Sequence, residues 1–318
     1  MSSVLVESGI RARRRGLSLA DWLGLAVALT IVGPSTLWSQ TPPTLGYPKR
    51  IAEASGSQVI VSDPALGGIA ALDKGTLQIV WSQTIEGDPL AVAACRNLVL
   101  VGNATTHKVE VYRVTGQGKK VEFLYHLGDN QTGFFKLPSD IATDVDLQLA
   151  FVLDGGEKTI KVFDLKGSFL YSLPAAGELL PLSPTAIAVD AGRQEVIISD
   201  YGDPSGSLFS GAAVPARLLL YTYAGKYLGM IDGRDRFGRP QGLAVDDLGR
   251  IYMVESLLGQ VFVFDRSTGN IVNRFGSFGQ ESGQLELPLD VVLDLKSGDL
   301  FVTNNMLQRV EVFRGVGR

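Results

Sequence analysis

Six acidic or amide residues each end a short apolar segment of the chain, and their side chains hold much of its potential for chemistry. These strand-end residues are Asp63, Asn103, Asp154, Asp200, Glu255 and Asn304. Carboxylate and amide oxygens are the ligands that Ca²⁺ takes in proteins, so a ring of such residues would predict a calcium site. Each also precedes a turn, where Asp and Asn accept backbone N–H groups. Both interpretations stay open, and the structural one is preferred.

A second charged group stands two positions after a proline that recurs along the chain. Arg50, Asp140 and Asp290 occupy this position, where the other copies have alanine or glycine. Two carboxylates that face each other could hold a cation or raise each other's pKa. Arg50 could instead neutralise Asp290, because buried charges need partners. We favour the ion pair.

A third group is basic and lies near aromatic residues. Arg234, Arg236 and Arg239 surround Phe237, which we expect to be exposed, and arginine beside an aromatic is typical of a partner-binding patch. A solvated loop of mixed charge is the alternative. Phe209 lies in the apolar insertion Gly202–Pro215, which either packs onto the scaffold or anchors a partner.

The chain contains too few reactive side chains for the common catalytic sites. It has two histidines, His107 and His126, and one cysteine, Cys95, so neither three imidazoles nor a thiolate cluster can bind zinc. No Gly-x-Ser-x-Gly elbow and no Gly-rich phosphate loop occurs. We therefore predict no catalytic residues and no cofactor, with Ca²⁺ as the exception to test. A calcium-dependent hydrolase or lactonase remains the alternative function.

These residues are positioned by an internal repeat. Its six copies begin at the prolines Pro48, Pro89, Pro138, Pro184, Pro240 and Pro288. The copy from Pro240 is the clearest, with four β-rich segments that end at Asp246, Glu255, Asp265 and Phe275. A repeat of about 40–50 residues with four strands predicts one blade of a β-propeller, and six copies predict six blades.

The blade pattern resembles the NHL repeat family. Pro240-Gln-Gly-Leu-Ala-Val-Asp246, followed by Gly249-Arg-Ile-Tyr-Met-Val-Glu255 and Gln260-Val-Phe-Val-Phe264, follows that family's pattern. The resemblance covers residues 48–313 and implies an all-β, six-bladed propeller. Some NHL-type propellers are enzymes with a histidine-bound zinc, but the histidines that this requires are missing here. A protein or peptide is therefore the expected partner.

A six-bladed ring would place Asp140 and Asp290 on opposite sides of its channel. The turns between the first and second strands of each blade are short and uniform, whereas the loops between the second and third strands and between blades vary. Because variable loops on a rigid scaffold are where binding resides, we expect the binding site on the variable face. After Phe313 too little chain remains for a fourth strand in blade six. Gln40–Tyr47 is the candidate to replace it, and we expect an imperfect closure.

The N-terminus predicts export. Arg11, Arg13, Arg14 and Arg15 precede an apolar run of eleven residues, 22–32, which suits a signal peptide but is short for a membrane span. We divide the chain into a signal peptide or anchor, 1–39, and a propeller, 40–318, in a periplasmic or extracellular compartment. An uncleaved segment, 11–33, would be the only membrane contact. The remainder, with 25 basic and 31 acidic residues, argues against binding nucleic acid.

Overall fold

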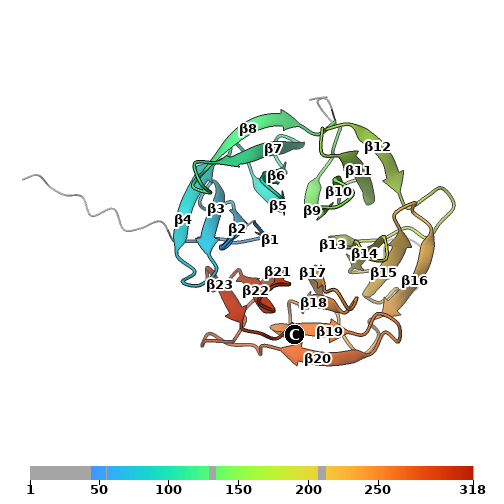
Figure 1. Ribbon diagram of the computed structural model, residues 1–318. Coiled ribbons are helices and arrows are strands. Elements are labelled where there is room, and N and C mark those ends of the chain that lie inside the picture. Colours follow the sequence, from blue (N-terminus) through green and yellow to red (C-terminus); the bar gives the residue numbers. More distant parts are fainter. Residues whose placement is uncertain (1–43, 55, 129–133, 207–212, 318) are drawn as a thin grey trace, which may run out of the picture. The chain divides into compact units, whose positions relative to one another are not determined.

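Short, mostly apolar segments of three to eight residues form antiparallel strands throughout the computed structural model. The structure describes residues 44–54, 56–128, 134–206 and 213–317, and all of them belong to one compact unit, Pro42–Arg318. Six sheets surround a central channel and form a six-bladed β-propeller (Figure 1). The expected signal segment and Phe209 lie outside the described residues. Within the described ranges there is no helix, and hence none that could cross a membrane.

We name the strands of a blade a to d from the channel outward. Blades one to three contain β1 (Ile51–Glu53), β2 (Gln58–Asp63), β3 (Gly68–Asp73), β4 (Ile79–Thr84); β5 (Pro89–Cys95), β6 (Leu98–Asn103), β7 (Lys108–Thr115), β8 (Lys120–His126); β9 (Pro138–Asp144), β10 (Leu149–Asp154), β11 (Thr159–Asp164) and β12 (Phe169–Leu173). Blades four to six contain β13 (Pro184–Asp190), β14 (Glu195–Asp200), β15 (Arg217–Thr222), β16 (Tyr227–Asp232); β17 (Pro240–Val245), β18 (Ile251–Glu255), β19 (Gln260–Phe264), β20 (Ile271–Phe275); β21 (Pro288–Asp294), β22 (Asp299–Asn304) and β23 (Arg309–Phe313).

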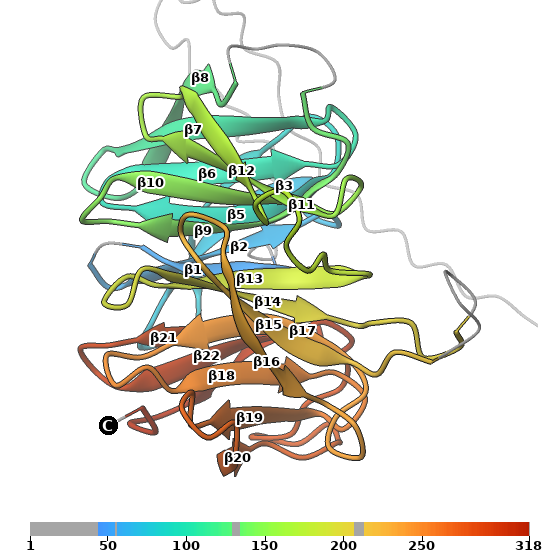
Figure 2. The same ribbon diagram turned by 90° about the vertical axis from the view of Figure 1, so that its right-hand side faces the viewer.

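The two faces of the ring differ in their connections. Figure 2 shows the ring from its side, with the C-terminal end on one face and the connection from β14 to β15 on the other. We call the face that carries the a–b and c–d turns the turn face. The face that carries the b–c and d–a connections is the loop face.

The blades pack face to face through apolar side chains. Six buried clusters occur, one at each junction between neighbouring blades. The clusters consist mainly of Val, Ile, Leu and aromatic residues of strands a to c, which are buried on both faces. Burial of such side chains contributes about 1.5–3 kcal/mol each, so these clusters hold neighbouring blades together.

Strand a of most blades begins with a β-bulge. In blades two, four and six the proline pairs with the strand-end residue of strand b, and the next paired residue is two positions later. Proline has no N–H, and the first residue of a strand is a position where it is tolerated. Because a bulge redirects the side chains near it, the shift occurs at the position of Asp290 and its equivalents.

Blade six has three strands, and its outer edge is β23. The expectation that Gln40–Tyr47 supplies the fourth strand is wrong for the described part of that segment. Thr44–Tyr47 forms no strand: Leu45 packs in the cluster between blades six and one, and Gly46 and Tyr47 donate their N–H groups to Asp63. The ring therefore closes without a fourth strand in blade six, in line with the expected imperfect closure. Side-chain contacts join blades six and one instead.

Candidate functional site

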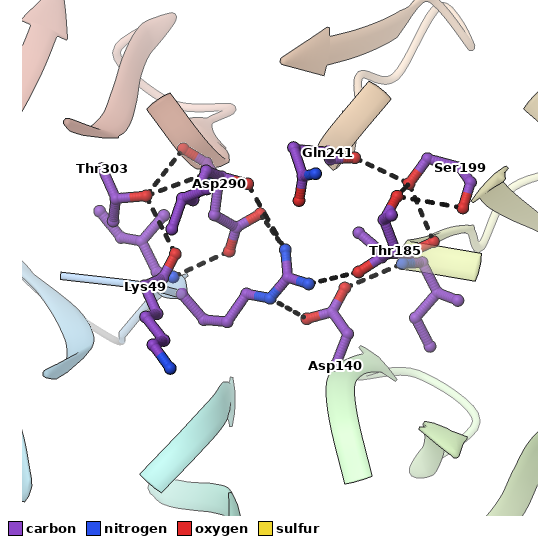
Figure 3. A network of polar contacts seen from close by, with 12 residues as sticks. Lys49, Asp140, Thr185, Ser199, Gln241, Asp290 and Thr303 are labelled. Atoms are coloured by element: carbon purple, nitrogen blue, oxygen red, sulfur yellow. Dashed lines mark hydrogen bonds and ion pairs between the residues drawn. The ribbon is translucent and has the colours of Figure 1, made fainter. Parts of the chain in front are cut away.

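Arg50 contacts two carboxylates, Asp140 from blade three and Asp290 from blade six. Figure 3 shows these two aspartates in the network of polar contacts. The Nε of Arg50 lies 3.5 Å from Asp140 Oδ1, and its Nη1 lies 3.8 Å from Asp290 Oδ1. The guanidinium also donates to the carbonyl oxygens of Ser139, Leu289 and Thr185. All three charged side chains are buried. The structural ion pair that the sequence favours therefore includes both carboxylates.

The second oxygen of each carboxylate accepts a backbone N–H. Asp290 Oδ2 accepts from Ile51 at 2.9 Å, and Asp140 Oδ2 accepts from Ile187 at 2.8 Å. Burial raises the pKa of Asp290 to about 7, although the Arg50 guanidinium lowers it in part. Burial likewise raises the pKa of Asp140. Two carboxylates share one cation here, so near neutral pH this group can take up a proton.

Glycine is required beside this group. A Cβ at Gly242 would lie 2.5 Å from the Cα of Asp290 and 2.0 Å from its Oδ1, closer than real side chains approach. Gly242 stands two residues after Pro240, at the position where the NHL pattern has glycine. At this blade the glycine therefore allows the next inner strand to approach closely.

A cavity of about 260 Å³ lies inside the channel and is bounded by Asp140 and Asp290. Apolar residues of the six inner strands and the exposed side chains of Val145 and Leu295, in turns of the turn face, complete its wall. Asp140 and Asp290 are engaged with Arg50 and with backbone N–H groups, whereas Glu53 pairs with Lys74 and the Thr143 hydroxyl donates to the Ala94 carbonyl. The charged group of Arg50, Asp140 and Asp290 therefore fits a structural role, in which it links the inner strands, better than a reaction centre.

The strand-end residues act as latches between two loops of the same blade. Asp154 accepts N–H groups from Lys136 and Leu137 in the loop before its blade, and from Glu157 in the turn after it. Asp63, Asn103, Asp200 and Glu255 repeat both sets of contacts. The Asn304 side chain contacts the preceding loop, at Glu286 and Gln284. The sequence predicted the contacts to the following turn, but not those to the preceding loop.

These hydrogen bonds use the oxygens that a calcium ion would need. Burial opposes ionisation of Asp154, but the N–H groups of Lys136 and Leu137, with the Lys161 ammonium 3.0 Å away, hold its pKa below the usual value. Asp200 pairs with Arg217 at 2.9 Å. No three of the His, Cys, Asp and Glu side chains in the described ranges are grouped so that they could hold a metal ion. Hydrogen bonds to the backbone of neighbouring loops therefore explain the geometry of these residues.

The basic group around Phe237 is not the exposed patch that the sequence suggested. Phe237 is buried, not exposed, and its ring packs 5.7 Å from that of Phe264. Arg236 donates to the carbonyl oxygens of Asp232 and Gly269 and lies over the Phe264 ring. An aromatic ring has a large apolar surface, so its burial is favourable, and the Phe237 ring points from its charged loop into the core. Only Arg234 and Arg239 of the predicted patch are exposed.

The insertion between β14 and β15 is described only at its ends. Asp203 and Val214 exchange two backbone hydrogen bonds of 2.8 Å, which close the base of the connection. Whether Phe209 anchors a partner remains a prediction, since it lies outside the described residues.

The two histidines occupy separate places in blade two. His107 Nδ1 lies 2.7 Å from the carbonyl oxygen of Lys136. His126 is partly buried on β8, where burial and Lys108 lower its pKa. Neither joins the channel group.

A band of exposed apolar side chains on the loop face was missed by the sequence analysis. Tyr47, Leu257, Leu258, Phe278 and Met306 are 45–63% exposed and belong to blades one, five and six. We call these five residues the apolar belt. Their loops touch: a Cβ at Gly259 would lie 2.9 Å from the Cα of Phe278, Met306 donates its N–H to Glu286, and Asn305 donates to the Pro48 carbonyl. The sequence does contain one sign of this surface: two consecutive leucines in the short turn after Glu255, where polar residues would be expected.

A pocket of about 520 Å³ on the same face was also missed. It is lined by Gly155, Lys158, Leu182, Ser183, Pro184, Thr185, Tyr201, Arg239 and Gln241. We call it the polar pocket. Its residues come from three consecutive blades, so no local sequence pattern could reveal it.

Comparison with known proteins supports the fold. No family model matches the chain. Over 172 residues, 52% of the chain, it is 26% identical to Protein brain tumor of Drosophila melanogaster, of which it covers 15%. It is structurally similar to a Kuenenia stuttgartiensis hydrazine synthase chain (TM-score 0.61, 14% identity, 89% of this chain and 99% of that one). A Bacteroides thetaiotaomicron structural genomics protein of unknown function is also similar (TM-score 0.64, 15% identity, 85% and 70%). These two likenesses concern the fold alone.

Proposed function

We propose that this chain, a six-bladed β-propeller with NHL-type blades, is a non-catalytic scaffold that binds a protein or peptide on its loop face. The observation that carries the proposal is the apolar belt. Five large apolar side chains are about half exposed on three neighbouring blades, and their loops contact one another directly. A contiguous exposed apolar patch on a rigid scaffold marks an interaction site.

The polar side chains of the scaffold support the same conclusion. Those in the channel and at the strand ends are engaged in ion pairs and in hydrogen bonds to the backbone. They hold the loops in place, so the loop face is preorganised for a partner. The exposed leucines of the turn face, such as Leu248, lie in separate a–b turns of the ring.

The test is affinity capture with surface variants. The triple variant Leu257→Ser, Phe278→Ser, Met306→Ser should lose a partner that the unmodified protein captures, and its dissociation constant for that partner should rise at least tenfold. The matched control is Leu248→Ser, which removes a leucine that is 70% exposed on the turn face. Equal capture by all three proteins, or equal loss from both variants, would contradict the proposed site.

We also propose that the propeller works outside the cytoplasm, after removal of residues 1–39. Support comes from the arginines at 11–15 followed by the apolar run. The expected N-terminus of the purified protein is Gln40, which Edman sequencing or intact mass would identify. Recovery of Met1 in a membrane fraction would instead show an anchor formed by residues 11–33.

A further inference from the structure

The polar pocket is lined by cationic and hydroxyl side chains and by no carboxylate. Lys158 and Arg239 bring positive charge, and Ser183, Thr185 and Tyr201 bring hydroxyl groups. Arg239 is exposed, and its hydrogen bonds within the described ranges are made by its backbone: its N–H donates to Glu255, and its carbonyl accepts from Ser256. The loop is thus held while the guanidinium stays available to a ligand.

The acidic residues beneath this region already have partners. Asp154 is paired with Lys161, and Asp200 with Arg217. The Glu255 carboxylate accepts N–H groups from Gly238, Arg239 and Leu258. These three carboxylates therefore interact with groups of the scaffold itself. The lining of the pocket contributes positive charge and no negative charge.

The channel network fixes two walls of the pocket (Figure 3). Thr185 Oγ1 donates to the Pro240 carbonyl at 2.8 Å, and Ser199 Oγ donates to the Gln241 carbonyl at the same distance. The Thr185 carbonyl itself accepts from Arg50. Blades four and five are thereby held together at the pocket, which reduces the entropy lost when a ligand binds.

The polar pocket adjoins the apolar belt. The carbonyl of Arg239 accepts the N–H of Ser256, the residue immediately before Leu257. A bound segment can therefore contact both surfaces at once. An extended residue spans about 3.3 Å, so an acidic side chain and an apolar side chain a few residues apart would be sufficient.

We propose that the polar pocket binds carboxylate side chains of an acidic segment in the protein partner, next to an apolar segment on the belt. The inference rests on the proposed protein-binding function and specifies the partner's chemistry. Arginine pairs with carboxylates through two parallel hydrogen bonds. A nucleic acid, whose phosphates would meet the same cationic side chains, is therefore a comparison ligand in the test. The backbone N–H groups of Leu182 and Ser183 are used by Asp200, so they do not offer a phosphate cradle.

The test uses fluorescein-labelled hexaglutamate at low salt, with hexaglutamine, a single-stranded RNA 12-mer and inorganic phosphate as comparison ligands. Fluorescence anisotropy should show that hexaglutamate binds and hexaglutamine does not. Arg239→Glu should weaken hexaglutamate binding at least tenfold, whereas Arg239→Lys should retain part of it. The control Arg96→Glu makes the same change of net charge on the turn face, where Arg96 is exposed, and should change affinity less than threefold.

Equal effects of Arg239→Glu and Arg96→Glu would overturn the proposal, because they would reveal a response to net charge alone. Binding of RNA through Arg239 without binding of hexaglutamate would also overturn it, as would displacement of hexaglutamate by millimolar phosphate. Partner capture separates this inference from the proposed function. If the belt variant loses the partner and Arg239→Glu still captures it, the protein-binding function stands but the partner does not use an acidic segment. If both variants still capture the partner, the proposed protein-binding site itself is wrong.

Discussion

Lys74 of blade one and Asp294 of blade six form a 2.9 Å ion pair across the junction where the ring closes. Both side chains are largely buried, and Lys74 also contacts Glu53 at 2.7 Å. Arg314 adds hydrogen bonds to the carbonyls of Lys74 and Gly75. These contacts join the two blades although blade six lacks a fourth strand.

Lys74→Met should therefore lower the free energy of unfolding by about 3 kcal/mol, because it leaves carboxylates without their buried partner. The measurement is urea denaturation followed by fluorescence. Hydrogen exchange should show faster opening of β1 and β21 to β23 than of the other blades. Lys136→Met, which breaks an exposed pair with Glu157 3.8 Å away, is the control and should cost under about 1 kcal/mol. A similar loss in both variants would mean that the junction has no special role.

The channel group should make stability depend on pH in the neutral range. The pKa of Asp290 is raised by burial to about 7, above its unfolded value, so the native protein binds more protons than the unfolded chain between about pH 4 and 7. Stability from this group is full at low pH and is lost as the pH rises through 7. Asp290→Asn resembles the protonated acid and should reduce this dependence, leaving the smaller part that comes from the raised pKa of Asp140. Unfolding free energies of both proteins at pH 5 and pH 8 provide the measurement; parallel changes with pH would contradict the assignment.

Gly242→Ala should destabilise the protein by about 1–3 kcal/mol, because the added Cβ meets the backbone of Asp290 and forces the inner strands apart. Gly238→Ala, four residues earlier, is the matched control: no heavy atom lies within 4 Å of its Cβ position. Thermal melts of both variants compare the two sites directly. A normal melt for Gly242→Ala would show that neighbouring blades can separate at little cost.

Calcium should have no effect on the melting temperature. The oxygens of the strand-end residues accept backbone N–H groups, and a bound cation would have to displace these donors. Melting curves in 1 mM CaCl₂ and in 1 mM EDTA should coincide to within about 1 °C. A rise of several degrees with calcium that disappears in Asp154→Asn would instead favour the metal-dependent alternative.

The fold could be predicted because each blade repeats the same local pattern of proline, apolar strands and turn residues. The contacts of the strand-end residues to the following turn are also local, over two or three positions, and follow from the chemistry of Asp and Asn. What could not be predicted depends on the closed ring. Arg50 reaches Ser139, Thr185 and Leu289, which are 89, 135 and 239 positions away. Phe237 shows a second limit: a loop of charged residues suggests exposure, yet its one ring turns into the core.

The latches also bear on how the protein folds during synthesis. Each connects residues only 15–20 positions apart, so a blade can be secured soon after its first two strands leave the ribosome. Arg50 is made early, but two of its partners, Leu289 and Asp290, are made near the end. The arginine must therefore stay solvated through most of translation, and its burial marks the moment at which the ring becomes complete.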